Sequence, residues 1–259
     1  MNEFIAALIL AVVQGLTEWL PVSSSGHLVL FQNILNYNPG LAFDVALHFG
    51  TLMAVFVYFG KDIVDISEAL LKGKWGSEDG KLGILLTVAT IPAAIIGYLL
   101  HSVFEAAFQS LSVTAIGFGI TGLVLIIASL DFKKNIKKMP TYVDSILIGL
   151  AQVAAIFPGI SRSGSTISAG LLTGLNEKNA MKFSFLMSIP VILGAGILEI
   201  GNKTLSSDLI WATLVAFIIG LATIYFLLRV VSNSKKNLRW FALYALLLSA
   251  STWAWLIFN

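Results

Sequence analysis

Long segments without a charged side chain limit the fold of this sequence more than any other feature. Four of them stand out: Leu82–Leu100, Ser112–Leu130, Leu209–Leu228 and Trp240–Phe258. Each has about the 20 residues that an α-helix needs to cross roughly 30 Å of hydrocarbon. Two shorter or interrupted segments, Val45–Gly60 and Phe183–Leu198, bring the expected membrane spans to six.

The composition agrees with a membrane protein and excludes several functions. Charged residues make up 12% of the chain, against about 25% in ordinary globular domains. Backbone amides in lipid must be satisfied within their own segment, and the alternating pattern of a membrane barrel is absent, so we predict an all-α polytopic fold over residues 1–259. The absence of cysteine excludes disulfides and thiolate chemistry. A net charge of +2 is too small to indicate nucleic acid, and no secretory signal is expected.

Two polar motifs resemble each other at a spacing of 138 residues. The first runs from Gln14 to His27 and the second from Gln152 to Thr166. At this spacing four positions are identical: Gln14 and Gln152, Ser23 and Ser161, Ser25 and Ser163, Gly26 and Gly164. We interpret the chain as two duplicated halves, approximately 1–130 and 139–259, that share a central site.

The segments that carry the motifs differ from the six spans. Residues 2–40 and 142–176 each contain an apolar run, a break of Pro, Gly and Ser, and a second short apolar run. This pattern predicts two re-entrant helix-loop-helix hairpins, with non-helical backbone buried in protein or facing a wet cavity. Three spans and one hairpin in each half give an odd number of crossings, so the halves have inverted topology. Such repeats place their site where the two halves meet.

The basic residues orient the chain. If the six spans alternate in direction and the hairpins do not cross, all but two of the 16 Lys and Arg residues fall on one side. The exceptions are Lys203, on the other side, and Arg162, inside the second motif. Because basic loops stay in the cytoplasm, both termini are expected to face outward. The first hairpin then enters from outside and the second from the cytoplasm. The basic linker Asp131–Pro140 joins the halves on the cytoplasmic side.

Glu18 is the first candidate for chemistry. It follows Gln14 by four residues, so the two side chains share a helix face. A carboxylate at membrane depth costs several kcal/mol unless it is paired or hydrated. Glu18 is therefore either a metal ligand or acid/base group, or a residue at a wet helix end.

The residues after Pro21 form a second cluster: Ser23, Ser24, Ser25, Gly26 and His27. Three hydroxyls beside an imidazole are typical of a nucleophile with its base, and Glu18 would be the orienting group. Serine is also a preferred helix N-cap, which is the competing interpretation. The imidazole of His27 weakens that alternative, because a cap does not need one.

The second motif, Pro158–Thr166, supplies a complementary charge. The guanidinium of Arg162 suits a phosphate group because it is planar, bidentate and permanently charged. Gly159 and Gly164 let the backbone turn, and free N–H groups at the start of the next helix would bind an anion. The alternative is an internal salt bridge from Arg162 to Glu18. Both interpretations hold together if Arg162 exchanges partners when a ligand arrives.

Other polar and aromatic residues are given structural roles. We interpret Asp44 and His48, four residues apart, as an interfacial cap and a polar helix-end residue. The tryptophans are interpreted as interfacial anchors; the most notable are Trp19, Trp240, Trp253 and Trp255.

The two motifs closely resemble those of the bacterial undecaprenyl pyrophosphate phosphatase family, also called the bacitracin resistance family. The resemblance covers essentially the whole chain. It implies hydrolysis of the lipid pyrophosphate to the monophosphate carrier of cell-wall synthesis, a dependence on a divalent cation, and a site that opens to the outer side of the plasma membrane. It also implies that Glu18, His27 and Arg162 are essential. Gln14 stands where the family has Glu or Gln, so a metal-ligand role there is weaker.

From this resemblance and the residues together we expect a defined site. Glu18 holds Mg²⁺ or Ca²⁺, Arg162 neutralises phosphate charge, and either Ser24 or His27 attacks the terminal phosphorus. The residues expected around the substrate are Gln14, Ser23, Ser25, Ser161, Ser163, Gly164 and Thr166. The partners are then a polyprenyl pyrophosphate and membrane lipid, and a homodimer is an open alternative to a monomer. The rival function is a polyprenyl-phosphate flippase or secondary transporter, which the inverted repeat favours and the serine-histidine cluster disfavours.

Overall fold

The computed structural model describes residues 2–130, 136–199 and 207–258. The expected basic positions Lys133, Lys134 and Lys203 lie outside the described residues. Within these ranges the secondary structure is helical, apart from an isolated parallel bridge between Lys137 and Leu175. The helices are α1 (Glu3–Thr17), α2 (Ser24–Leu35), α3 (Leu41–Tyr58), α4 (Gly60–Leu71), α5 (Glu78–Leu99), α6 (His101–Phe108), α7 (Leu111–Ser129), α8 (Tyr142–Ala154), α9 (Arg162–Leu172), α10 (Glu177–Glu199), α11 (Ser207–Asn233), the short 3-10 helix η1 (Lys235–Asn237) and α12 (Leu238–Phe258).

Six helices in the described part of the chain are long and apolar enough to cross a membrane. They are α3, α5, α7, α10, α11 and α12. Each contains or overlaps one of the six segments predicted from the sequence. The prediction of an all-helical polytopic membrane protein is therefore confirmed at this level.

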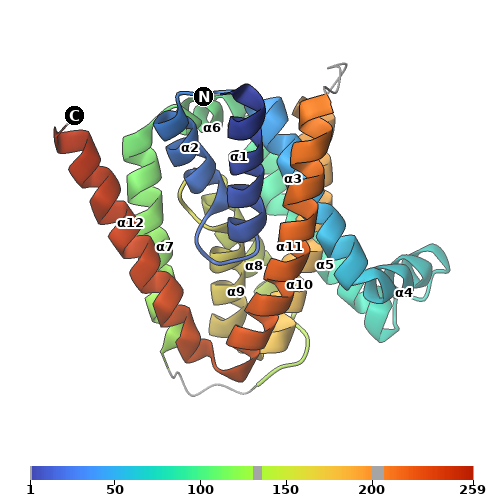
Figure 1. Cartoon of the computed structure of the whole chain (residues 1–259). Coiled ribbons are helices and arrows are strands. Elements are labelled where there is room, and N and C mark those ends of the chain that lie inside the picture. The colour runs from blue at the N-terminus through green and yellow to red at the C-terminus, as the bar shows by residue number, and fades with distance from the viewer. Residues whose placement is uncertain (1, 131–135, 200–206, 259) are drawn as a thin grey trace.

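The two motifs lie between pairs of short helices. Helices α1 and α2 pack against each other on either side of the first motif's loop, and α8 and α9 do the same around the second. In Figure 1 the α1–α2 pair occupies the end of the bundle at which both termini lie, and its connecting loop turns back inside the bundle. The α8–α9 pair occupies the opposite half of the bundle.

Corresponding serines begin the second helix of each pair. Ser23 caps α2 by accepting a hydrogen bond from the Gly26 N–H (3.3 Å), and Ser161 caps α9 by accepting one from the Gly164 N–H (3.0 Å). The capping interpretation is thus confirmed for Ser23, and Ser161 has the same role in the second motif. A serine three residues before a glycine performs the same local task in both motifs, because the hydroxyl satisfies an amide that the first turn leaves free.

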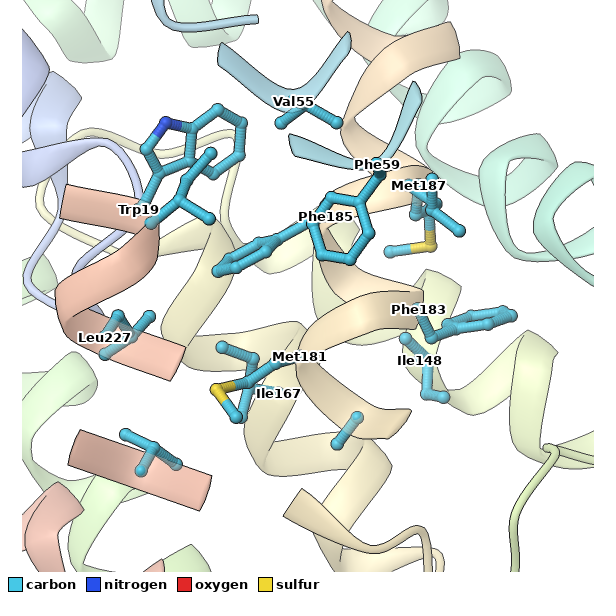
Figure 2. Packing of buried hydrophobic residues seen from close by; sticks show 14 of the residues in the cluster. Trp19, Val55, Phe59, Ile148, Ile167, Met181, Phe183, Phe185, Met187 and Leu227 are labelled. Carbon is cyan, nitrogen blue, oxygen red and sulfur yellow. The ribbon is translucent and has the colours of Figure 1, made fainter. Parts of the chain in front are cut away.

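Aromatic residues pack together within a largely aliphatic core (Figure 2). Trp19 packs edge-on against Phe185 of α10 at 5.1 Å between ring centroids, and Phe59 reaches the same ring at 6.1 Å. Trp19 is completely buried, so its assignment as an interfacial anchor is wrong. The other three tryptophans named with it, Trp240, Trp253 and Trp255, are exposed. This packing fixes the position of Trp19, the residue that follows Glu18.

Candidate functional site

Glu18 and Arg162 form an ion pair between the two motifs. Arg162 Nη2 lies 2.5 Å from Glu18 Oε1, and the guanidinium also stands over the Trp19 ring at 5.2 Å from its centroid. Glu18 is the C-cap of α1 and Arg162 is the first residue of α9. Only 4% of the Glu18 side chain and 15% of the Arg162 side chain are exposed. The structure thus contains the salt bridge that the sequence offered as one interpretation.

The second carboxylate oxygen of Glu18 has three further residues around it, two of which donate hydrogen bonds to it. Gln14 Nε2 donates to Glu18 Oε2 at 3.0 Å, and Ser24 Oγ donates to the same oxygen at 2.5 Å. His48 Nε2 lies 3.4 Å from it. These contacts give partners to both oxygens of the buried carboxylate. The hydrogen bond from Ser24 places Glu18 where a general base for this hydroxyl would lie.

His27 is not the partner of Ser24. Its Nδ1 lies 2.7 Å from the Ser23 carbonyl oxygen and its Nε2 lies 2.8 Å from the Tyr244 hydroxyl. Its ring stacks on Tyr244 and meets the edge of Phe118. Both ring nitrogens are occupied, so the hypothesis that His27 is the base for Ser24 does not fit these contacts. The side chain that Ser24 contacts is Glu18.

Ser23 has an unusual backbone conformation immediately before Ser24. Its φ angle is +69°, which for a residue with a side chain costs about 1–3 kcal/mol and persists only where the surroundings impose it. The carbonyl of Ser23 accepts hydrogen bonds from the backbone N–H of His27 (3.2 Å) and from its ring. The strained turn directs Ser24 toward Glu18.

The second motif is held by α7 and by the first motif. Thr121 Oγ1 donates to the Gly159 carbonyl (2.8 Å) and accepts from the Ser161 N–H (2.9 Å). Ser163 Oγ donates to the Leu20 carbonyl at 3.0 Å, which joins the two loops directly. These bonds fix the start of α9, and with it the position of Arg162.

Glycines allow the two loops to touch. A Cβ on Gly26 would overlap Gly159 and the Phe118 ring. Gly159 has a φ angle of +87°, and a Cβ there would overlap the Thr114 carbonyl of α7. A side chain at Gly26 would separate the two loops, and one at Gly159 would push the second loop away from α7. The Glu18–Arg162 contact depends on the approach of the two loops.

A cavity of about 560 Å³ opens beside the ion pair. Polar residues of both motifs, α3 and α8 form one end of its wall: Glu18, Ser23, Ser24, Ser25, Asp44, His48, Gln152, Ser161 and Arg162. The rest of the wall is largely apolar and comes mainly from α5, α6, α10 and the turn after α8, with Ala93, Phe104, Ile192 and Ile156 among its residues, although Thr90, Tyr98, His101 and Glu105 also line it. The cavity therefore joins a charged end to a largely apolar wall, as an amphipathic lipid with a charged head requires.

Several expected site residues do not line this cavity. They are Gln14, His27, Ser163, Gly164 and Thr166. Gln14 acts through Glu18, and Thr166 Oγ1 bonds to Ser184 Oγ of α10 at 2.6 Å. These five residues lie outside the cavity lining. The expected residues that do line the cavity are Glu18, Ser23, Ser24, Ser25, Ser161 and Arg162.

Three cavity residues were missed or misjudged from the sequence. Asp44 is buried and accepts a hydrogen bond from Gln32 (2.7 Å), while Gly40 is the N-cap of α3, so the capping role given to Asp44 is wrong. His48 belongs to the site through Glu18 and is not only a polar helix end. Gln152 is buried, and neither atom of its side-chain amide has a hydrogen-bond partner. The four-residue spacing of Asp44 and His48 on an apolar span was the available signal.

The comparisons with known proteins agree with the motifs. The sequence model for the bacitracin resistance protein BacA matches residues 7–251. The chain is 43% identical to an undecaprenyl-diphosphatase of Thermosipho melanesiensis over 243 residues, which cover 93% of this chain and 95% of the relative. It is 43% identical to one of Rubrobacter xylanophilus over 267 aligned positions, covering 96% and 97%, and 38% identical to one of Methanococcus maripaludis over 233, covering 89% and 92%. With the two motifs meeting in one cavity, these matches show that the chain belongs to the bacitracin resistance protein BacA family.

Proposed function

We propose that this protein is an undecaprenyl-diphosphatase, which hydrolyses the lipid diphosphate to the lipid monophosphate and inorganic phosphate. The observation that carries the proposal is the pairing of Ser24 and Arg162 on one carboxylate, Glu18, at the charged end of the cavity. The names of the relatives supply the substrate. The prenyl tail would lie along the apolar wall between α5 and α10.

Arg162 is the phosphate clamp in this proposal. Its guanidinium can exchange Glu18 for phosphate oxygens, because both acceptors fit the same planar donor fork. Phosphoryl transfer depends on neutralising charge on the equatorial oxygens. The amide of Gln152, buried without a partner, would gain one from the substrate head.

Ser24 is the proposed nucleophile. Its Oγ attacks the terminal phosphorus while Glu18 takes the proton through the 2.5 Å hydrogen bond. The bond from phosphorus to the bridging oxygen breaks, and Glu18 passes the proton to the departing lipid phosphate. In the second step Glu18 takes a proton from water, the hydroxide forms the new bond to phosphorus, and Ser24 Oγ leaves and recovers the proton.

Trapping the phosphoenzyme separates Ser24 from His27. A phosphoserine survives acid, whereas a phosphohistidine is rapidly lost, so brief quenching of the protein with labelled substrate in acid distinguishes them. We expect acid-stable label on the peptide containing Ser24, and none in Ser24→Ala. Acid-labile label that disappears in His27→Ala would make His27 the nucleophile.

A divalent cation, Mg²⁺ or Ca²⁺, is proposed to assist. No cluster of three His, Cys, Asp or Glu side chains suited to a metal occurs among the described residues, so the protein offers Glu18 rather than a complete cage. Mg²⁺ is commonly held by one or two carboxylates together with substrate phosphates, and this donor set fits that pattern. The bound cation would neutralise phosphate charge. Activity that withstands chelation and is insensitive to added Mg²⁺ or Ca²⁺ would remove it from the proposal.

The membrane arrangement is also part of the proposal. We infer that α1–α2 and α8–α9 are re-entrant hairpins of two inverted halves, with the termini and the cavity mouth on the outer side. The chain has no cysteine, so single cysteines can be introduced and labelled in intact cells. Asn38→Cys should react with an impermeant reagent from outside, and Gly76→Cys should react only after lysis. Labelling on the same side for both would overturn this orientation. The homodimer stays a prediction that the mass of the detergent complex would check.

Phosphate release in detergent tests the function directly. The purified protein should release inorganic phosphate from undecaprenyl diphosphate in micelles, where no gradient or second leaflet exists. A flippase or secondary transporter, which the opposed hairpins favour, would move lipid in vesicles without releasing phosphate. Lipid movement without hydrolysis would replace the proposed function with that alternative.

A further inference from the structure

We propose that Tyr244, in the last helix α12, is a positioning residue for the loop that presents Ser24. It acts through His27, which holds the Ser23 carbonyl. The inference rests on the proposed function, in which Ser24 and Glu18 do the chemistry. Neither motif contains Tyr244, which is 217 residues from His27.

The contact between Tyr244 and His27 is extensive. The hydroxyl lies 2.8 Å from His27 Nε2, and the two rings are stacked within 5° of parallel at 5.7 Å between centroids. Phe118 of α7 closes the other side of the imidazole, edge-on at 5.3 Å. His27 is almost completely buried, so its ring is held from three directions by α2, α7 and α12.

The hydrogen bonds assign the tautomer of His27. Its Nδ1 faces the Ser23 carbonyl at 2.7 Å, and a carbonyl can only accept, so Nδ1 carries the proton. In the neutral ring Nε2 then has only a lone pair, and the Tyr244 hydroxyl must be the donor to it. Tyr244 thereby selects the tautomer in which His27 donates to Ser23.

This chain of bonds ends at the strained turn. Ser23 keeps its φ angle of +69° while its carbonyl accepts from His27 twice. A strained conformation persists when neighbouring groups over-determine it. If the Tyr244 hydroxyl is removed, the ring of His27 is free to change tautomer or turn, and the Ser24 hydroxyl loses its fixed approach to Glu18.

The test is Tyr244→Phe, which removes the hydroxyl and keeps the stacked ring. We expect kcat for phosphate release in detergent to fall about tenfold or more, with KM for the lipid within about twofold of wild type, because orientation is lost and substrate contacts are kept. The matched control is Tyr225→Phe on α11, an exposed tyrosine outside both motifs whose ring packs against Tyr58, which should keep wild-type kinetics. Melting temperatures of all proteins are measured in the same detergent.

A double-mutant cycle separates positioning from general packing. In a His27→Asn background the amide can still donate to the Ser23 carbonyl, but no group remains for the Tyr244 hydroxyl. Adding Tyr244→Phe should then cost no further activity, since residues that act as one unit are not additive. His27→Ala serves as the background if His27→Asn does not fold.

The outcomes are distinct. Wild-type kinetics in Tyr244→Phe, or an equal loss of activity with His27 present and replaced, would overturn the positioning role. A rise in KM with unchanged kcat would also overturn it, since Tyr244 would then contribute to substrate binding. Wild-type protein that releases no phosphate would refute the proposed function itself, before any variant is compared.

Discussion

Arg162 Nη2 lies 2.5 Å from Glu18 Oε1, although 144 residues separate the two in sequence. Each belongs to a different loop, so the ion pair forms only when both loops reach the middle of the bundle. The carboxylate is almost completely buried, and a buried charge that loses its partner is strongly destabilising. One contact thus links the assembly of the fold to the chemistry at Ser24.

Arg162→Ala should therefore reduce both activity and stability. We expect phosphate release to fall at least about 100-fold, because the guanidinium proposed to neutralise the phosphate is lost, and the melting temperature to fall because Glu18 loses its ion-pair partner. Arg162→Lys keeps the charge but not the bidentate fork and should recover stability more than activity. Phosphate release and thermal unfolding in detergent measure the two effects.

The control for this prediction is Arg229→Ala, which removes an exposed arginine of α11 and should change neither quantity. Normal turnover in purified Arg162→Ala would contradict the clamp. Equal loss of activity and stability in Arg162→Lys and Arg162→Ala would show that the geometry of the guanidinium accounts for both.

Gln152→Leu should raise stability and weaken substrate binding. The amide of Gln152 is buried with no partner, and such a group costs about 1–3 kcal/mol, so an apolar side chain of similar size relieves that cost. The same change removes a donor and an acceptor from the cavity wall. We expect a higher melting temperature together with a higher KM for the lipid diphosphate.

Gln14→Leu provides the comparison. Gln14 occupies the equivalent position of the first motif, but its amide donates to Glu18 at 3.0 Å, so its replacement should lower the melting temperature. A melting temperature that falls in Gln152→Leu, with KM unchanged, would mean that Gln152 serves only the fold.

Gly159→Ala should push the loop of the second motif away from α7. The φ angle of +87° disfavours a residue with a Cβ, and that Cβ would overlap the Thr114 carbonyl. The left-handed backbone alone costs about 1–2 kcal/mol, and the overlap adds to it. Melting temperature and phosphate release should both fall. Gly76→Ala, where a Cβ meets nothing within 4 Å, is the control, and equal stability of the two variants would contradict the close approach.

The sequence was sufficient to predict the six spans and the pairing of Glu18 with Arg162. Long uncharged segments specify helices because lipid offers no other way to satisfy the backbone. Glu18 and Arg162 each stand among apolar residues in the sequence. A charge at membrane depth is costly unless it has a partner of opposite charge, so the two residues predict their own pairing. These predictions follow from local chemistry and from the scarcity of charge.

The contributions of α3, α7 and α12 to the site could not be predicted in the same way. Asp44 and His48 share a helix face, but spacing alone does not tell what that face meets. Tyr244 is one of many aromatic residues in apolar helices, and only the packing of α12 against α7 brings it to His27. Trp19 was misjudged because its residue type favours interfaces, whereas packing against Phe185 and the Arg162 guanidinium buries it.

Acid should weaken the start of the second hairpin through Asp144. Burial raises the pKa of this carboxyl, but hydrogen bonds from Lys137 and Thr141 lower it more, so the pKa of Asp144 lies below its ordinary value. Lys137 Nζ is 2.8 Å from Asp144 Oδ2, and Thr141 completes a capping box with it. A carboxyl whose pKa is lower in the folded protein contributes its full stabilisation at pH values above its pKa in the unfolded chain, about 3.9. This contribution, roughly 1 kcal/mol for such a bond, is lost as the pH falls below that pKa.

Asp144→Asn should remove this dependence. Relative to wild type, we expect a lower melting temperature at pH 7 and a smaller further fall between about pH 5 and pH 3. Glu68→Gln is the matched control, because Glu68 forms an exposed pair with Lys72 (2.6 Å) and exposed pairs contribute little. The interaction is refuted if Asp144→Asn and wild type lose stability in parallel as acid is added. Asp144 lies at the end of α8 that is remote from Arg162. Its replacement should therefore change phosphate release at pH 7 much less than it changes the melting temperature.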